Sequence, residues 1–185
     1  MKSVSHIFGT EAKVKIMRLF IFNPSLIFTS NEVSARVKER IDKVRKEILN
    51  LSKAGLIKRR LNGFVLDSSY PYLRALENFL IDATPMTEKE IIKKISRAGN
   101  VKLILISGVF LHDRDSRIDI LVVGDHLKHK KLVSAILSIE ALLGKELRYA
   151  TFETTDFQYR ISIYDKLIRD ILESQNKKIL NKLGI

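Results

Sequence analysis

Apolar residues at helical spacing predict three helices in the first third of the chain. Gly9–Asn23 suits a buried helix whose apolar positions are Val14, Ile16, Met17, Leu19 and Phe20. FTSNEVSARVK predicts a short second helix, with Val33 and Val37 four residues apart after the N-cap candidates Thr29, Ser30 and Asn31. A longer third helix ends near Gly55, a typical C-cap residue, and its apolar stripe consists of Ile41, Val44, Ile48 and Leu51.

A β-hairpin is expected directly after the third helix. The strand-like runs LIKRR and FVLD flank Asn62-Gly63. An Asn-Gly pair between such runs is typical of a type I′ turn, because both central residues of that turn need a positive φ. The first arm of the hairpin is strongly basic, and the polar side of the preceding helix carries Lys43, Lys46, Asn50 and Lys53.

A connecting helix is predicted over Ser68–Pro85. Pro71 lies near its start after the cap candidates Ser68 and Ser69, and its apolar stripe consists of Leu73, Leu76, Phe79 and Leu80. The stripe would suit either a dimer contact or packing against its own domain. We place the domain boundary just after this helix, which gives domains at residues 1–84 and 85–185.

The second half has the pattern of an α/β domain of about 100 residues. A capping box at Thr87 and Glu90 opens a helix, and buried strands follow at 101–106 and 118–123. A helix over Leu127–Lys145, an alternating strand over Glu146–Glu153, one long helix and a short amphipathic tail complete the chain. The expected fold class is therefore a two-domain protein of the α+β or α/β type.

Charge adds information about partners. The 185 residues carry a net charge of +12, and the sequence pI is about 9.9. Residues 1–80 hold 15 Lys and Arg against 7 Asp and Glu, so the first half contains two thirds of the excess. Such a balance favours a polyanionic partner, with nucleic acid ahead of a membrane surface.

Cysteine and hydropathy narrow the classes further. The absence of cysteine excludes disulfides, thiolate zinc sites and cysteine nucleophiles. No apolar run approaches the roughly 18 residues that a membrane span needs, and the start lacks a signal-peptide core. We expect a cytoplasmic protein that does not act at a membrane.

The first half resembles winged helix-turn-helix regulators of the MarR-like and ArsR-like kind. The features that carry the resemblance are the apolar spacing of residues 31–60 and the ending LSKAGLIKRR. In that family the third helix enters the major groove of double-stranded DNA and the wing follows the flanking backbone. The matching positions here are Arg40, Lys43, Lys46, Asn50, Lys58, Arg59 and Arg60, which offer phosphate contacts and base-edge readers.

Two other interpretations of the same residues stay open. Lysines on the outer face of a helix are often simply solvated, and winged helices also serve as dimerisation or protein-contact modules. Glu39 and Asp42 lie beside the start of the third helix and are expected to weaken phosphate contact there.

SGVFLHDRDSRIDILVVGD, residues 107–125, resembles the signature of minimal nucleotidyltransferases with a polymerase-beta-like fold. Their pattern is Gly-Ser after a strand, a loop, and Asp-apolar-Asp on the next strand, with a third carboxylate on a later strand. Those carboxylates hold two divalent metals. Here Gly108 matches, but Val109 replaces the serine, and Arg117 replaces the first aspartate while Asp119 remains.

The resemblance therefore implies a degenerate pocket of Gly108, Arg117 and Asp119, without catalytic residues, metal or other cofactor. Arg117, two residues before Asp119 on a predicted strand, would share its face and neutralise its carboxylate. The later strand offers Arg148 and Thr151 where a carboxylate would be needed, although Glu153 lies further along.

The sequence gives little support for other arrangements of metal ligands. Asp113, Asp115 and Asp119 do not fit a calcium loop, because Arg117 occupies a ligand position and no Gly or closing Glu is in register. His112 beside Asp113, and His126 with His129, are the remaining metal-ligand candidates.

The leading hypothesis is a homodimeric DNA-binding transcriptional regulator, not an enzyme, whose second domain senses a small-molecule or nucleotide ligand or mediates contacts. The first alternative is an active metal-dependent nucleotidyltransferase of the toxin–antitoxin type with a winged-helix targeting domain. The second is a pure interaction module whose basic wing is incidental.

Overall fold

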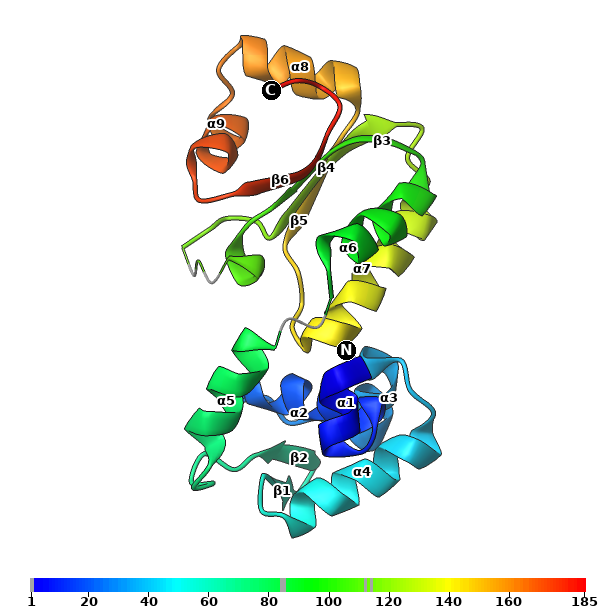
Figure 1. The fold of residues 1–185 in the computed structure, drawn as a ribbon, viewed down its shortest axis with the longest axis vertical. Coiled ribbons are helices and arrows are strands. Elements are labelled where there is room, and N and C mark those ends of the chain that lie inside the picture. Colours follow the sequence, from blue (N-terminus) through cyan, green and yellow to red (C-terminus); the bar gives the residue numbers. More distant parts are fainter. Residues whose placement is uncertain (1, 84–85, 112, 114) are drawn as a thin grey trace. The chain divides into compact units, whose positions relative to one another are not determined.

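The computed structural model describes residues 2–83, 86–111, 113 and 115–185 as a mixed α+β protein (Figure 1). Its strands form a two-stranded sheet and a separate four-stranded sheet. The chain divides into two compact units. The first consists of Met1–Thr87 and Leu137–Glu146, and the second consists of Glu88–Ile136 and Leu147–Ile185.

The first unit begins with four helices, a hairpin and a fifth helix. In chain order they are α1 (Lys2–Phe8), α2 (Glu11–Ile21), α3 (Ser30–Val37), α4 (Ile41–Lys53), β1 (Ile57–Arg60), β2 (Gly63–Leu66) and α5 (Leu73–Asp82). The expected periodic residues of α2, α3 and α4 form one buried core, in which Phe20, Val33 and Val44 are fully covered. Ile41 is the exception, because it is only half-buried and does not belong to this core. The pattern of apolar residues did not predict α1.

Local capping explains where these helices begin and end. Thr10 caps α2, and of the three expected candidates Thr29 caps α3, in a capping box with Glu32. Gly55 follows the end of α4 with a φ of +82°, and the amide of Leu56 donates to the carbonyl of Leu51. The expected glycine stop of α4 is thus confirmed, because a left-handed residue lets the chain reverse there.

The hairpin forms, but its turn is one residue away from the predicted position. Arg60 pairs with Gly63, so the central residues are Leu61 and Asn62, and neither has a positive φ. The predicted type I′ turn at Asn62-Gly63 is therefore wrong. Gly63 is required for another reason: a Cβ there would lie 2.5 Å from the carbonyl oxygen of Phe28, which forms a β-bridge with Phe64.

Helix α5 begins later than expected and packs against its own unit. Tyr72 precedes it without a side-chain cap, while the expected cap residue Ser69 donates its hydroxyl to Asp67 instead. Leu80 is buried, and Leu73 and Leu76 pack against the core of the first unit, whereas Phe79 is 39% exposed and its ring lies against Phe8 of α1. Of the two roles considered for this stripe, the structure shows packing within the unit; Pro85 lies outside the described residues.

Arg18 of α2 forms hydrogen bonds with the C-terminal end of α5. Its guanidinium is buried and donates to the carbonyl oxygens of Leu80, at 2.7 Å, and Ala83. Burial lowers the pKa of Arg18 to about 10. The last carbonyls of a helix have no partners within the helix and carry partial negative charge, so a cation stabilises them.

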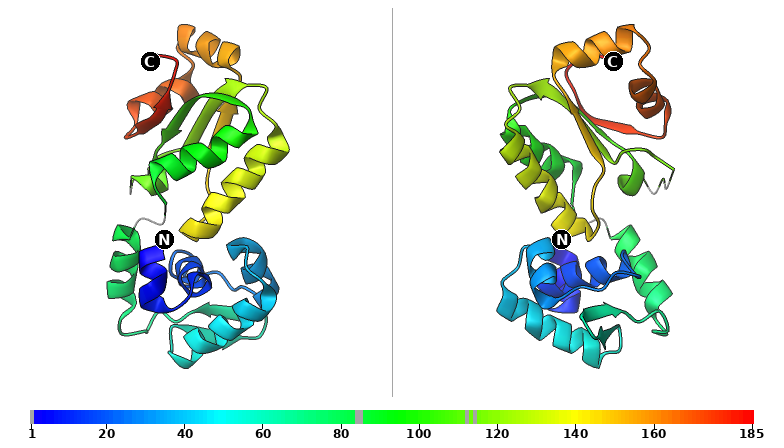
Figure 2. Two further views of the ribbon diagram at one scale, coloured as in Figure 1. Left: turned by 45° about the vertical axis from the view of Figure 1, so that its right-hand side comes forward. Right: turned by 180° about the vertical axis from the view of Figure 1, so that it is seen from behind.

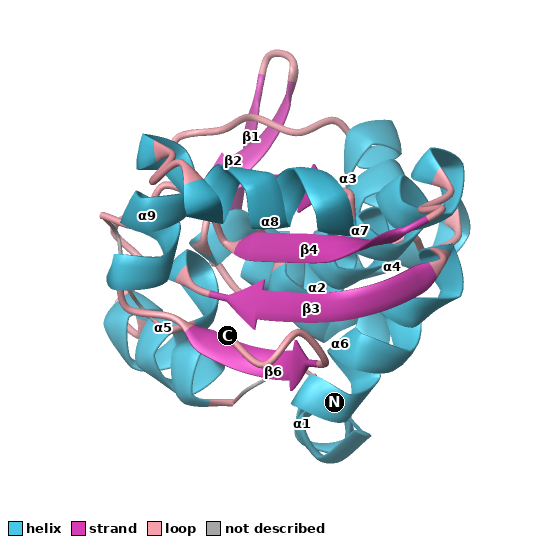
Figure 3. Ribbon diagram, turned by 90° about the horizontal axis from the view of Figure 1, so that it is seen from above, coloured by secondary structure: helices cyan, strands magenta, loops and turns pink. Residues whose placement is uncertain are grey.

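The second unit is built around a four-stranded mixed sheet in the order β5-β4-β3-β6 (Figures 2 and 3). Strands β3 (Asn100–Ile106) and β4 (Ile120–Asp125) are antiparallel, and β5 (Tyr149–Phe152) runs parallel to β4. Phe157 of α8 (Thr154–Ser162) and Ile168 and Ile171 of α9 (Lys166–Glu173) pack against alternate strand residues. On the other side of the sheet lie α6 (Glu88–Ile95), with the 3₁₀ turn η1 (Ser96–Ala98), and the first half of α7 (His129–Leu143). A second 3₁₀ turn, η2 (Gly108–Phe110), follows β3.

The end of the chain departs from the prediction in two ways. The expected final long helix is broken into α8 and α9, because Tyr164 adopts a φ of +55° and Asp165 starts a new helix by capping the amide of Ile168. The expected amphipathic tail contains a strand, β6 (Lys177–Asn181), which pairs antiparallel with β3. The pattern of apolar and polar residues covers too few positions here to distinguish a strand from a helix.

Glu47 connects the core side of α4 to the start of α2. Its buried carboxylate accepts a hydrogen bond from the Thr10 hydroxyl at 2.8 Å, and Lys13 Nζ lies 3.5 Å away. Burial opposes ionisation, but hydrogen bonds from Thr10 and Asn50 and the charge of Lys13 outweigh it, so the pKa of Glu47 lies below its ordinary value.

We expect Glu47→Ala to lower the free energy of unfolding by about 2 kcal/mol, because it removes a buried, charged acceptor of hydrogen bonds from Thr10 and Asn50. Asp82→Ala removes an exposed carboxylate from the same unit and should change that energy by less than about 0.5 kcal/mol. Urea unfolding followed by circular dichroism, with hydrogen exchange of α2 and α4, measures both. Equal effects of the two substitutions would contradict this role of Glu47.

The same carboxylate should make stability depend on acid pH. Since the folded-state pKa of Glu47 is lowered, its contribution is present above its ordinary value of 4.5 and is lost as pH falls through the folded-state pKa. The difference in unfolding free energy between the wild type and Glu47→Gln should therefore shrink below pH 4.5. Unfolding titrations at pH 7 and pH 3 test this, and a pH-independent difference would contradict it.

Candidate nucleic-acid interface

The outer face of α4 carries the cations that the sequence predicted for DNA contact. Lys43, Lys46 and Asn50 are exposed, opposite the buried stripe of Val44, Ile48 and Leu51. Within the part of the chain that the structure describes, neither lysine has a hydrogen bond or ion pair. Sequence reasoning missed Arg45, which is also exposed and free and which its position on the helix at 100° per residue could have revealed.

The start of α4 is less acidic than expected. Glu39 does not lie free beside the helix, because its carboxylate pairs with Lys15 Nζ at 2.8 Å. Arg40, the residue before α4, lies 3.4 Å from Asp42, and both side chains are largely exposed. A contact of this kind in water is weak. Arg40 therefore remains available to a phosphate, and Asp42 is the acidic side chain left at this end.

Two of the three cations of the hairpin are exposed and unpaired within the described residues. Arg59 and Arg60 are exposed and have no partner among the described residues, whereas Lys58 Nζ lies 3.0 Å from Asp67. The Ser69 hydroxyl and Lys58 lower the pKa of Asp67 to about 2, so this carboxylate stays charged and holds Lys58. Leu61, at the tip of the hairpin, is 100% exposed.

The hairpin and α4 form one continuous part of the first unit. Gly55 and Leu56 lead directly from the helix into β1, and Figure 1 shows the hairpin beside the C-terminal end of α4. The free cations of both elements therefore belong to the same region of the unit. We call this set the α4 surface; it consists of Arg40, Lys43, Arg45, Lys46, Arg59 and Arg60.

Asp119 in the second unit is a buried structural carboxylate. Its relative exposure is 3%, and both of its oxygens are occupied. Oδ1 accepts the amide of Val109 at 2.9 Å, and Oδ2 accepts the amide of Arg148 at 2.8 Å. The backbone of Asp119 also bonds Ser107 and Arg148. Asp119 thus joins three segments: the turn after β3, the entry to β4 and the entry to β5.

Gly108 is required by the same carboxylate. Its φ is +52°, a left-handed conformation, and a Cβ at this position would collide with Oδ1 of Asp119. The two residues named from the nucleotidyltransferase pattern are therefore in direct contact. Their contact requires glycine at position 108, because any Cβ there would overlap the carboxylate.

Arg117 does not neutralise Asp119 as the sequence suggested. Its guanidinium lies 3.1 Å from Asp170 of α9, and it is Nε of Arg148 that lies 3.4 Å from Oδ2 of Asp119. Alternation failed as a guide because β4 begins at Ile120, so Arg117 and Asp119 lie in irregular backbone before it. Arg148, noted in the sequence as an unsuitable metal ligand, takes the role that was expected of Arg117.

The weaker metal candidates do not come together. His112 lies outside the described residues, and Asp113 accepts the amide of Asp115 in a local turn. His126 has a φ of +54° and precedes α7, which His129 begins. Among the described residues, no three His, Asp or Glu side chains form a group that could hold a metal ion.

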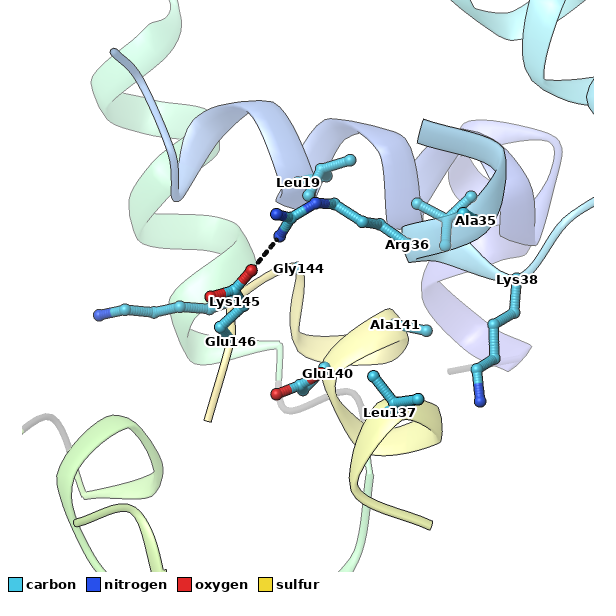
Figure 4. Close-up of a pocket in the computed structure, with 11 residues that line it drawn as sticks. Leu19, Ala35, Arg36, Lys38, Leu137, Glu140, Ala141, Gly144, Lys145 and Glu146 are labelled. Atoms are coloured by element: carbon cyan, nitrogen blue, oxygen red, sulfur yellow. Dashed lines mark ion pairs between the residues drawn. The ribbon is translucent and has the colours of Figure 1, made fainter. Parts of the chain in front are cut away.

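A pocket of about 380 Å³ lies within the first unit, lined by α2, α3 and the last part of α7 (Figure 4). Leu19, Leu137 and Ala141 make part of its lining apolar. At its edge Arg36 Nη1 and Glu146 Oε1 pair at 2.7 Å. Its volume falls within the range of small-molecule sites.

No helix within the described residues is both long and apolar enough to cross a lipid bilayer. Comparisons with models of protein families, with curated proteins and with solved structures gave no significant match.

We expect Asp119→Ala to destabilise the second unit by on the order of 3 kcal/mol, because two buried amides lose their acceptor. Gly108→Ala should cost less in the Asp119→Ala background than in the wild type, since the collision with the carboxylate is gone and the positive φ alone remains. The coupling energy should be about 1 kcal/mol or more. Hydrogen exchange of peptides from β3 and β4 measures it.

Asp115→Ala, in the exposed loop, is the control and should leave exchange in β3 and β4 unchanged. Additive effects of the Gly108 and Asp119 substitutions would contradict the contact. Stabilisation of the wild type by Mn²⁺ that disappears in Asp119→Ala would show instead that this carboxylate holds a metal.

Proposed function

We propose that this protein is a DNA-binding transcriptional regulator whose first unit holds double-stranded DNA in the manner of a winged helix. The single observation that carries the proposal is the α4 surface, where every exposed lysine and arginine except Arg40, which has a weak contact with Asp42, has no carboxylate partner in the described chain. In this proposal α4 enters the major groove, and Arg59 and Arg60 of the hairpin contact the flanking backbone.

The order of elements supports the proposal independently of charge. Three helices followed by a two-stranded hairpin is the order of a winged helix-turn-helix, and α4 is the longest of the three, at 13 residues. Asn50 on the exposed face of α4 is a side chain that can read adenine. Lys58 contributes least, because Asp67 already holds it.

The second unit is proposed to serve regulation or contacts and not nucleotide transfer. The internal engagement of both Asp119 oxygens supports this, since a metal would have to displace two buried amide donors. In this proposal the second unit keeps a nucleotidyltransferase-like fold but does not catalyse nucleotide transfer. A homodimer is part of the proposal, since two copies of α4 could occupy two half-sites of one operator.

We expect the full chain to bind a labelled duplex at 50 mM salt with an affinity that falls steeply as salt rises, because phosphate contacts release counterions. Lys43→Ala, Lys46→Ala and Arg60→Ala together should lower that affinity by on the order of 100-fold. Fluorescence anisotropy measures both effects.

The control replaces Lys166, Arg169 and Lys182 by alanine, which removes the same charge from exposed positions of the second unit. If the two triple variants bind equally well, α4 and the hairpin are not the interface. Selection from a pool of random duplexes tests the regulatory part, and the failure to enrich any sequence would restrict the protein to sequence-independent binding.

A further inference from the structure

The second unit carries a cationic surface of its own, which DNA binding through α4 does not use. Lys89, Lys93 and Arg97 follow one another at intervals of four residues along α6 and η1, and all three are exposed. Four residues of a helix rise by about 6 Å, so the three charges form a row. The row lies opposite Ile91 and Ile95, which are buried.

The start of α7 extends this row. The amide of Lys128 donates to the carbonyl of Ala98 at 2.7 Å, which joins the end of η1 to the loop before α7. A Cβ at Gly99 would lie 2.7 Å from the carbonyl oxygen of His126, so the two segments are in close contact. We call the combined set the α6 surface; it consists of Lys89, Lys93, Arg97, Lys128, Lys130 and Lys131, all exposed.

Most of the neighbouring carboxylates form ion pairs with cations that do not belong to the α6 surface. Glu88, at the start of α6, lies 2.6 Å from Lys177, and Asp125 lies 2.7 Å from Lys102. Lys102 and Thr154 lower the pKa of Asp125 to about 2, which keeps that pair charged. None of the six cations of the α6 surface has an ion pair within the described residues, and Glu90, the other acidic side chain of α6, also has an interaction of its own.

The side chains of the α6 surface favour nucleic acid over a membrane or a protein as the partner. None of the large apolar side chains that are exposed in the described residues belongs to α6 or η1, and the one on α7, Leu137, lies about two turns beyond Lys130. A membrane-binding helix needs such side chains to enter the interface, and the centre of a protein interface is poor in lysine and rich in aromatic residues. A row of lysines and arginines without apolar neighbours suits the phosphates of a duplex, which carry one charge per about 1.7 Å of axis.

We propose that the α6 surface is a second, sequence-independent phosphate-binding surface for double-stranded nucleic acid. It takes its partner from the function proposed above but uses none of the same residues. Base readout is not part of the proposal, because the observations that carry it are charge and exposure, and contacts to phosphates alone satisfy both.

The test compares four forms of the full chain on a labelled duplex of mixed sequence between 50 and 200 mM salt. They are the wild type, Lys89→Ala/Lys93→Ala/Arg97→Ala, the Lys43/Lys46/Arg60 variant and the Lys166/Arg169/Lys182 control. Alanine at exposed helical positions leaves the fold intact. The first variant should lower the salt slope by about 3, so its loss of affinity over this range is about 40-fold smaller than that of the wild type.

The outcomes separate this inference from the proposed function. Weakened binding in the Lys89 variant, with wild-type binding in the Lys43 variant, supports the α6 surface and overturns the role of α4. The reverse pattern, or a Lys89 variant that matches the control, overturns the α6 surface. A wild type that binds no duplex overturns both. Sedimentation with phosphatidylserine vesicles that depends on Lys89, Lys93 and Arg97 while duplex binding does not would assign the surface to a membrane instead.

Discussion

The placement of a small number of carboxylates decides which charges this protein leaves exposed. The chain has 33 lysines and arginines but only 21 aspartates and glutamates, so at least 12 of the cations have no carboxylate of their own. Glu39 and Glu47 turn toward α2, and Asp67 holds Lys58. These pairings leave the outer face of α4 almost purely cationic. Charge separation within the fold, more than net charge, is therefore the basis for proposing a polyanionic partner.

The sequence predicted well whatever depends on one helix or one cap. The stripe of Val44, Ile48 and Leu51 and the stop at Gly55 are local, and the structure confirms them. The hairpin register was not predictable, because the demand for glycine at position 63 comes from the backbone of Phe28, more than 30 residues away. The break at Tyr164 and the pairing of β6 with β3 likewise depend on contacts that a periodic pattern does not contain.

Asp119 illustrates how a buried carboxylate can be misread from sequence. An acidic residue next to an apolar strand suggests a metal ligand, because a buried charge needs compensation. Here two backbone amides, from Val109 and Arg148, provide it, together with the Arg148 guanidinium, whose Nε lies 3.4 Å from Oδ2. Amide donors carry no side-chain signature, so the residue types around Asp119 could not reveal them. Its position was predictable, but its hydrogen-bond partners required the fold.

The row of Lys89, Lys93 and Arg97 also has a consequence for the helix that carries it. Like charges four residues apart repel, at a cost of about 0.2–0.5 kcal/mol per pair, and α6 has only eight residues over which to offset it. Salt screens this repulsion, as it screens any contact with a polyanion. A higher ionic strength therefore has two opposite effects on α6. It stabilises the helix in the unbound protein, and it weakens any binding of a polyanion to the helix.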